Sequence, residues 1–279
     1  MRCLLNHAGM AVTLTASLLP AWALAADATD AKADPSPWPN IYFDFSTTFS
    51  TTPAGTLAIG ARAFPLQTSA SSSLLFSAPL SVDITDRLTI YTGPAWTRSK
   101  SSGSSWTPWV PGTWTTGFSY DVISTDTAGP TLTVTGAFAR PIRSPIFGGY
   151  TTWSGGLNLD YALNDDQTNG WRADFSFDKT IFRGVTAFVH PTIMASAGAY
   201  HKWDNGWKLT GHVGFQIFRG AAVANLIKLK GTTQPFVGFD FERYDDNDNK
   251  LFGITMGVGW SRAPSVLLTV STPLYFIRH

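Results

Sequence analysis

Residues 232–279 read TTQPFVGFDFERYDDNDNKLFGITMGVGWSRAPSVLLTVSTPLYFIRH. Bulky apolar side chains occupy every second position in three runs, as in Val237, Phe239 and Phe241 of the first run. Small or charged residues fill the alternate positions, and turn-forming stretches separate the runs. A period of two predicts strands with one apolar and one polar face. Because a small soluble barrel needs large apolar side chains inside, this pattern favours a barrel with an apolar outer face toward lipid and a polar lumen.

The N-terminus has the pattern of an export signal. A basic residue precedes an apolar run at 11–19, and the sequence ALA at 23–25 offers a small-residue cleavage site. The run is shorter than the roughly 18–20 apolar residues of a spanning helix. It therefore predicts a secretory signal peptide over residues 1–25, cleaved after the last of them. Residues 26–39 are rich in Ala, Asp and Pro and are expected to be a disordered lead-in, with one domain over 40–279.

Composition agrees with a membrane barrel and excludes some partners. Charged residues make up 14 % of the chain and aromatic residues another 14 %, whereas soluble domains carry roughly 25 % charged residues. The formal net charge is +1 and falls to zero when Arg2 leaves with the signal peptide. This balance does not indicate nucleic-acid binding. The single cysteine, Cys3, lies in the signal peptide, so the mature chain is expected to lack disulfides.

Period-two segments recur from residue 40 to the end, and most have about the 9–11 residues of a tilted spanning strand. The expected strands are 40–51, 55–66, 74–84, 88–98, 113–123, 131–141, 152–163, 171–181, 185–200, 207–219, 232–244, 251–261 and 265–277. Thirteen spanning strands would put the N-terminus and the C-terminus on opposite sides of the membrane, with the N-terminus outside the cell. We therefore expect about twelve, with the membership of 40–51 left open.

The connections and the tryptophans support this arrangement. Compact Asp/Asn/Gly turns alternate with longer stretches at 99–112, 143–151 and 220–231, as short periplasmic turns alternate with longer external loops in such barrels. Tryptophans lie near both ends of the expected strands, where indole rings form interfacial girdles. Core packing in a soluble sandwich is the alternative explanation. The expected girdle residues are Trp96, Trp114, Trp171, Trp207 and Trp260.

The signal peptide, the alternating strands, the turn at 84–88 and the terminal Leu274-Tyr275-Phe276 resemble Gram-negative outer-membrane β-barrel proteins of the porin-like class. The resemblance implies an all-β fold, a single antiparallel transmembrane barrel in the cell outer membrane. It also implies contact with outer-membrane lipid and with the assembly machinery. Members usually end on an aromatic residue, whereas this chain closes with three residues after Phe276. Neither a specific family nor an oligomeric state follows.

Charged and polar residues of the inward parity are the candidate functional residues, because a Lys or Arg facing lipid near the midplane costs roughly 2–4 kcal/mol. They either set ion selectivity or form interior ion pairs that only satisfy the lumen. The wall between residues 160 and 178 carries an excess of carboxylates, which predicts a weak preference for cations. Lys179 has the outward parity. The expected lumen residues are Asp160, Arg172, Asp174, Asp178, Asp240, Glu242, His190 and His212.

Signals for catalysis or for a bound metal are weak. His190 and Ser196 share a parity on one expected strand and His212 lies on the next, but no motif surrounds them. The run at 245–250 resembles the start of a calcium loop, yet it has Lys250 where the turn needs Gly. We expect no catalytic residues, no metal site and no cofactor, and no enzymatic activity.

Three functional hypotheses remain. The first is a passive channel for small polar solutes or ions, supported by the charged lumen and by glycines such as Gly257 and Gly259 on the inner face. The second is a closed structural or interaction barrel that uses its external loops, above all 99–112 with Trp106 and Trp109. The third is an outer-membrane enzyme acting on lipid or glycan. A barrel of about twelve strands allows a filled or an open interior.

Overall fold

The structure, a computed structural model, describes residues 40–60, 67, 69–125, 127–143, 149–184, 187–223, 227–245 and 249–277. The expected signal peptide and lead-in lie outside this part. The strands are β1 (Ile41–Thr52), β2 (Ser71–Ser77), β3 (Leu80–Thr85), β4 (Leu88–Ser101), β5 (Val110–Ile123), β6 (Gly129–Pro141), β7 (Tyr150–Ala162), β8 (Asn169–Phe182), β9 (Ala187–Val189), β10 (Thr192–Lys202), β11 (Trp207–Phe218), β12 (Ala221–Val223), β13 (Ile227–Leu229), β14 (Thr232–Tyr244), β15 (Lys250–Trp260) and β16 (Pro264–Ile277). None of the described residues forms a helix long and apolar enough to cross a membrane.

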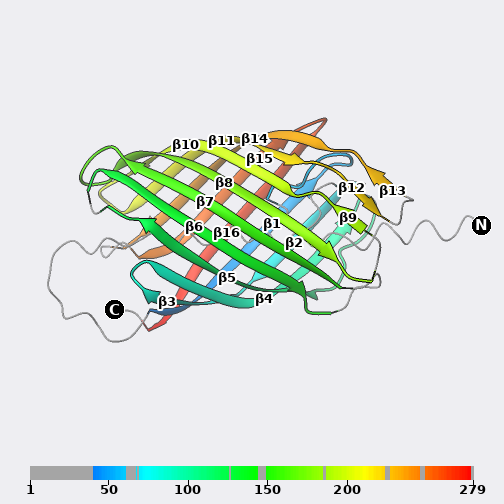
Figure 1. Ribbon diagram of the computed structural model, residues 1–279, viewed down its shortest axis with the longest axis horizontal. Coiled ribbons are helices and arrows are strands. Elements are labelled where there is room, and N and C mark those ends of the chain that lie inside the picture. Colours follow the sequence, from blue (N-terminus) through cyan, green and yellow to red (C-terminus); the bar gives the residue numbers. More distant parts are fainter. Residues whose placement is uncertain are drawn as a thin grey trace, which may run out of the picture.

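The large sheet closes on itself (Figure 1). Each wall strand pairs antiparallel with the next, and β1 pairs with β16 to complete the circle. Both β2 and β3 pair with β1 on one side and with β4 on the other, so they form one wall strand interrupted at Ala78 and Pro79. Proline has no N–H to donate to a ladder, which explains the break there. The wall therefore has twelve strands, as predicted.

The predicted number of strands is correct, but the segment whose membership was left open is not the one that lies outside the wall. Residues 40–51, whose membership was open, form β1 and close the barrel against β16. The expected strand 55–66 is instead absent from the wall over its described part, residues 55–60, which form turns. Residues 61–66 lie outside the described part. The even number of strands keeps Ile41 and Ile277 paired at one end of the barrel.

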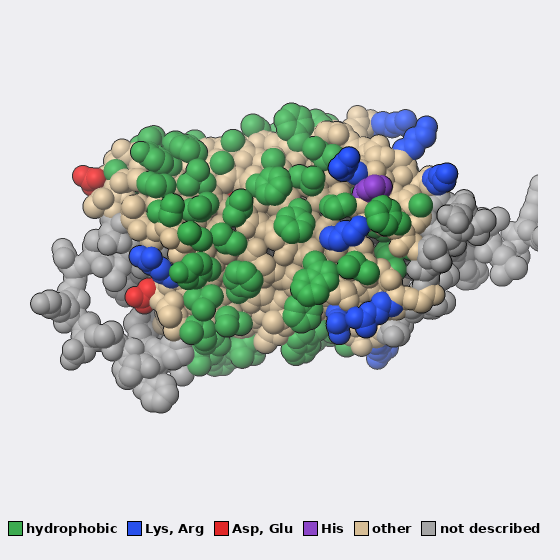
Figure 2. Space-filling model, viewed as in Figure 1, with side chains coloured by type: hydrophobic (Ala, Val, Ile, Leu, Met, Phe, Trp, Pro, Cys, Tyr) green, Lys and Arg blue, Asp and Glu red, His purple; other side chains and the backbone are tan. Residues whose placement is uncertain are grey.

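The two faces of the wall have the predicted polarity. On the outside, Val213 is 64 % exposed and Met256 48 %, whereas the inward Thr210 and Gln234 are fully buried. Green apolar side chains cover the barrel surface between its two ends in Figure 2. A continuous exposed apolar band of this kind would be unfavourable in water and is the lipid-facing surface of a membrane barrel. The protein is an outer-membrane β-barrel.

Tryptophans lie toward both ends of this band, each beside another outward group. Trp171 stacks on Tyr161 with ring centroids 5.3 Å apart, and Trp207 stacks on Phe241 at 4.5 Å. Both tryptophans lie at the periplasmic ends of their strands, Trp171 near the start of β8 and Trp207 at the start of β11. Trp96, Trp114 and Trp260 lie nearer the opposite end, and the Trp114 Nε1 donates to Thr92 Oγ1 at 2.9 Å.

The connections differ between the two ends. Tight turns such as 86–87 and 203–206 join strands at the end that holds the termini of the wall, and class rules make this end periplasmic. At the other end, the extracellular one, the connections are longer, apart from 261–263. Two of them form a three-stranded sheet from β9, β12 and β13 (Figure 1). The expected strand 185–200 is therefore two strands, β9 in this sheet and β10 in the wall.

Candidate functional site: the lumen

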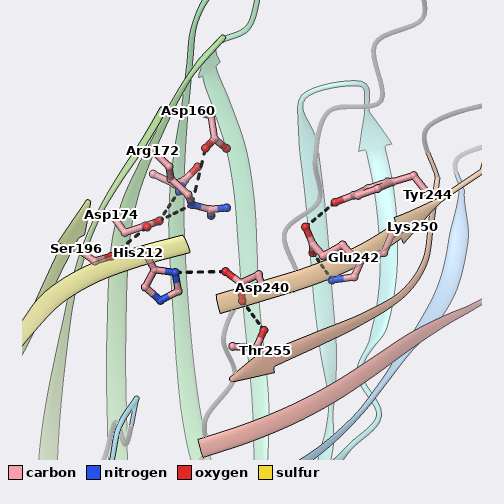
Figure 3. A network of polar contacts seen from close by, with 11 residues as sticks. Asp160, Arg172, Asp174, Ser196, His212, Asp240, Glu242, Tyr244, Lys250 and Thr255 are labelled. Atoms are coloured by element: carbon pink, nitrogen blue, oxygen red, sulfur yellow. Dashed lines mark hydrogen bonds and ion pairs between the residues drawn. The ribbon is translucent and has the colours of Figure 1, made fainter. Parts of the chain in front are cut away.

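The periplasmic half of the lumen holds a cluster of ion pairs (Figure 3). Arg172 on β8 is 5 % exposed, and its Nε lies 3.1 Å from Asp174 Oδ1 and 3.8 Å from Asp160 Oδ1. Asp174 also accepts hydrogen bonds from Asn158 and, at 3.2 Å, from Ser196 Oγ. Register explains the grouping, because Asp160 pairs directly with Arg172 across β7 and β8. One guanidinium thus lies between two carboxylates within the wall, and one negative charge of the three groups remains.

A second group lies on the next strands along the wall. His212 Nδ1 on β11 is 3.5 Å from Asp240 Oδ2 on β14, and Thr255 Oγ1 on β15 donates to Asp240 Oδ1 at 2.6 Å. The His212 ring leans over Gly238, where any Cβ would collide with it. Three neighbouring strands therefore supply one imidazole, one carboxylate and one hydroxyl in a row, with the glycine making room for the ring.

A third group lines the periplasmic mouth. Glu242 Oε1 accepts from Lys250 Nζ at 2.7 Å, and its Oε2 accepts from the Tyr244 hydroxyl at 2.9 Å. Lys208, 6 % exposed, pairs in register with Glu242 and places its ammonium 4.2 Å from the Tyr200 ring centroid. Burial of a charge is costly unless it is paired and hydrogen-bonded. Glu242 and Lys250 are paired and hydrogen-bonded, and the Lys208 ammonium lies over an aromatic ring, so these groups hold this end of the lumen in a defined arrangement.

The structure therefore brings seven of the eight expected lumen residues to the inner face of the wall. Asp178, the seventh, accepts from Ser154 Oγ at 2.6 Å. His190 is not among them. It follows β9 in the extracellular connection, and its ring packs edge-on against Phe188, which is 56 % exposed. The prediction failed because it treated 185–200 as one strand.

The inner face carries more acid than base. The inward carboxylates are Asp44, Asp83, Asp121, Asp160, Asp174, Asp178, Asp240 and Glu242. The inward cations, by the same parity, are Arg172, Lys202, Lys208 and Lys250. All three lysines and five of the carboxylates lie near the periplasmic ends of their strands, whereas Asp174, Asp178 and Asp240 lie nearer the middle of the wall.

The groups that could have formed a Ser–His site point to different partners. Ser196 donates to Asp174, whereas His212 Nδ1 faces Asp240 and its Nε2 faces Gly238. Within the described residues, no three His, Cys, Asp or Glu side chains are grouped so as to hold a metal ion.

The extracellular half of the lumen is filled by the connection between β1 and β2. Its described residues 53–60, which we call the inserted segment, are bound to the wall by six hydrogen bonds. The side chains of Gln216, Gln234 and Ser265 supply wall partners for all six. The bonds are Leu57 N to Gln234 Oε1 (3.0 Å), Gln234 Nε2 to Leu57 O (2.9 Å), Ser265 Oγ to Leu57 O (2.8 Å), Thr56 Oγ1 with Ser265 Oγ (3.0 Å), Gln216 Nε2 to Ala58 O (3.1 Å) and Gly60 N to Gln216 Oε1 (3.3 Å).

Packing complements these bonds. Leu57 is fully buried in a small apolar cluster with Phe218, Val189 and Ala221. Its neighbour Ile59 lies against the inner face of β15 at Gly257 and Gly259, and a Cβ on Gly259 would also meet the Gln234 amide. The inner-face glycines, read from the sequence as a sign of an open passage, instead make room for the inserted segment.

A cavity of about 120 Å³ lies between the inserted segment and the ion pairs. Its wall includes the polar residues Asp174, Asp178 and His212 on one side and Ile59 and Phe236 on another. The cavity holds a few water molecules or one small solute, since a water in liquid occupies about 30 Å³. The inserted segment thus forms an upper barrier, and the cavity, a chamber, separates it from the ion-paired side chains that line the periplasmic half.

Several of these residues were not predicted as site residues. Gln216, Gln234 and Ser265 carry no charge, and the sequence shows only that they share the inward parity. A large amide on the inner face of a membrane strand needs a buried partner, and this is the signal that could have indicated a segment inside the barrel. Lys250 was assigned to a turn, yet a register shift between Arg243 and Tyr244 brings it beside Glu242.

Comparison with solved structures gives the same fold. An outer-membrane channel from Pseudomonas putida F1 matches with a TM-score of 0.54 and 14 % identity, over 90 % of this chain and all of that one. The translocator domain of the autotransporter NalP from Neisseria meningitidis matches with a TM-score of 0.52 and 12 % identity, over 84 % and 88 % of the two chains. No protein-family model and no curated protein matches the sequence. At these identities the likeness is one of fold, and the chain belongs by fold with the outer-membrane β-barrels.

Proposed function

We propose that this outer-membrane barrel is a channel for small polar solutes or ions, and that the conformation described is its closed state. The observation that carries the proposal is the chamber: a cavity lined in part by Asp174, Asp178 and Asp240 and bounded above by a segment that is not part of the wall. A purely structural barrel has no need for a charged chamber under a separable cover. Ser196 and His212 face different carboxylates, so the proposal assigns the lumen a passage role and no catalysis.

The inserted segment is the proposed gate. Its six bonds to the wall involve neutral groups, each worth about 0.5–1.5 kcal/mol net, and ordering a residue costs about 1–2 kcal/mol in backbone entropy. For the five residues 56–60 these two sums are of the same size, and burial of the Leu57 side chain adds about 1.5–3 kcal/mol. The segment can therefore leave the lumen at a cost of a few kcal/mol, whereas the wall strands, held by full ladders, cannot.

A reversible cross-link tests this gate. Thr56 Oγ1 and Ser265 Oγ are 3.0 Å apart, so the double change Thr56→Cys with Ser265→Cys places two thiols within reach of a disulfide. The mature chain is expected to contain no other cysteine. We expect the oxidised variant to conduct little in a planar bilayer and the reduced variant to recover wild-type openings.

The matched control links two wall strands. Ser50 Oγ and Ser73 Oγ, on β1 and β2, are 2.7 Å apart, and Ser50→Cys with Ser73→Cys should leave conductance unchanged whether oxidised or reduced. A variant with residues 54–69 replaced by a short Gly-Ser turn should conduct more than wild type. If that variant shows no conductance, the inserted segment is not what closes the barrel, and the hypothesis of a structural or interaction barrel replaces the channel.

A further inference from the structure

Charge is segregated along the barrel axis. The stretches 53–70, 98–112, 140–151, 179–191, 219–231 and 260–264, whose described residues lie toward the extracellular end, contain eleven Lys or Arg residues and no Asp or Glu. The eleven are Arg62, Arg98, Lys100, Arg140, Arg143, Lys179, Arg183, Arg219, Lys228, Lys230 and Arg262. In Figure 2 most blue side chains gather at one end of the barrel, whereas the red ones lie at the other end, where blue is also present. These stretches therefore supply cations and no carboxylates to the extracellular end, which we call the basic rim.

Part of this basic rim faces outward beside loop tryptophans. Arg98 and Lys100 continue the outward parity of Trp96 on β4. The Arg98 guanidinium carbon lies 4.8 Å from the Trp106 ring and 5.8 Å from Trp109, and Lys100 Nζ lies 5.4 Å from Trp106. Stacking holds the charges at the edge of the apolar band. In the described part of the chain neither cation has a carboxylate partner.

Two further cations continue the rim around the wall. Arg140, at the outward end of β6, lies 6.0 Å from the Phe138 ring. Lys179 on β8 lies 4.4 Å from the Phe188 ring, and its Nζ donates to the Val189 carbonyl at 2.7 Å. Strands are about 4.8 Å apart, so β4, β6 and β8 present outward cations at intervals of about 10 Å. The rim spans a surface wider than one small anion.

We propose that this rim, Arg98, Lys100, Arg140 and Lys179 on the outer face of β4 to β8, binds the phosphorylated glycolipid headgroups of the outer leaflet. Three features favour that occupant. The cations lie where a headgroup meets the apolar band, their aromatic neighbours suit an amphipathic ligand, and their spacing suits a headgroup with more than one phosphate. Arg and Lys are the residues that bind phosphate oxygens. A basic residue near an anionic membrane surface contributes about fivefold in affinity.

The test is binding of purified lipid A, which carries two phosphates, to the full chain in detergent, followed by native mass spectrometry. We expect Arg98→Gln with Arg140→Gln to weaken binding at least tenfold. The matched control is Arg87→Gln with Arg243→Gln. It removes the same charge at the periplasmic end, where Arg243 likewise lies 5.5 Å from an aromatic ring, that of Trp207, and it should bind like wild type. Heat-modifiable migration on a gel verifies that each variant is folded.

Three ligands identify the source of the binding. Dephosphorylated lipid A should bind at least tenfold more weakly than lipid A, and millimolar inorganic phosphate should not displace lipid A. Phosphatidylglycerol, with one phosphate, should also bind more weakly. The proposal is overturned if the rim variant binds lipid A like wild type, if the periplasmic control loses as much, or if phosphatidylglycerol binds equally well.

Discussion

The two halves of the lumen are filled by different chemistry. The extracellular half holds the inserted segment, fixed by neutral hydrogen bonds from Gln216, Gln234 and Ser265. The periplasmic half is lined by the wall's own side chains, with Arg172 and Lys250 paired to carboxylates. The inserted segment is a separate piece of chain, whereas the periplasmic side chains are anchored on strands that cannot move apart. The difference suggests that only the extracellular barrier is built to be displaced.

Energetics sharpen this contrast. Removing one partner of a neutral buried hydrogen bond costs about 1–3 kcal/mol, and removing one partner of a buried ion pair costs about 3–5 kcal/mol. Changes in the periplasmic, lower half of the lumen should therefore lower the free energy of unfolding. Changes in the extracellular, upper half should raise the open fraction, which is the fraction of time that the channel conducts. Variants in the two halves can test whether this division holds.

The largest effect is expected for Arg172→Met. It leaves Asp160 and Asp174 as neighbouring buried carboxylates without their guanidinium, so we expect a loss of about 3–5 kcal/mol in the free energy of unfolding. Urea unfolding in lipid vesicles measures it. The triple variant that also carries Asp160→Asn and Asp174→Asn should recover most of the loss. A stability of Arg172→Met equal to wild type would mean that the lower cluster is not a structural anchor.

The next largest effect separates the lumen from lipid. Ile254 and Thr255 are consecutive on β15, one facing outward and the other toward Asp240. Ile254→Lys places a cation in lipid at a cost of about 2–4 kcal/mol, whereas Thr255→Lys places it beside a carboxylate. We expect the first to impair assembly and the second to assemble, by the yield of heat-modifiable protein. Similar yields would contradict the assignment of faces on which both halves depend.

This face assignment is the part of the fold that the sequence predicted best. An apolar side chain at every second position of a strand must point to one face, and lipid outside with water inside gives the two faces opposite polarity. Phe239 and Ile254 could therefore be placed without a structure. The pairing of strands was less accessible. The bulge beside Tyr244 that moves Lys250 next to Glu242 depends on the register of β14 and β15, which no local pattern specifies.

A smaller effect on stability is expected in the upper half. Gln216→Ala with Gln234→Ala removes side-chain partners of Leu57, Ala58 and Gly60. We expect the free energy of unfolding to fall by about 1–3 kcal/mol, because the freed segment can form hydrogen bonds with water instead. Single-channel recordings should show a higher open fraction. An unfolding loss as large as that of Arg172→Met, with no added conductance, would show that the upper barrier is also structural.

Two neighbouring glycines give a finer test of the same barrier. A Cβ on Gly259 would collide with Gln234 Nε2, whereas one on Gly257 would make ordinary contacts of 3.7 Å with Ile59. Gly259→Ala should therefore displace the Gln234 amide, cost about 1 kcal/mol and raise the open fraction. Gly257→Ala is the matched control and should behave like wild type. Equal behaviour of the two alanines would mean that Gln234 does not hold the segment.

The inserted segment itself could not have been predicted from strand patterns. Leu57 and Ile59 alternate with Ala58 and Gly60, as in a wall strand, but their apolar side chains pack inside the barrel. The same alternation therefore fits either a wall strand or a segment inside the barrel. Which of the two forms depends on the side chains that the segment would contact on the inner face. Here the counterpart is a set of inward amides and glycines far away in sequence, on β11, β14 and β15. Contacts of this kind become visible only when the barrel is closed.

The smallest effect concerns ions in the chamber. Asp174 and Asp178 line it from β8, and Arg172 already neutralises part of the charge of Asp174. Asp174→Asn with Asp178→Asn removes two negative charges from a confined path, where less water screens them than in bulk. We expect the open channel of wild type to prefer cations weakly, and the variant to lose part of that preference in reversal potentials across a salt gradient.

Its control removes the same charge outside the lumen. Asp165→Asn with Asp166→Asn lies in the periplasmic turn between β7 and β8, so the reversal potential should stay at the wild-type value. High salt should reduce the preference of wild type toward that of the chamber variant, since the Debye length falls to about 3 Å at 1 M. An anion preference, or equal shifts in the two double variants, would show that ions do not sense the carboxylates of the chamber. The charged wall would then serve the structure of the lower half alone.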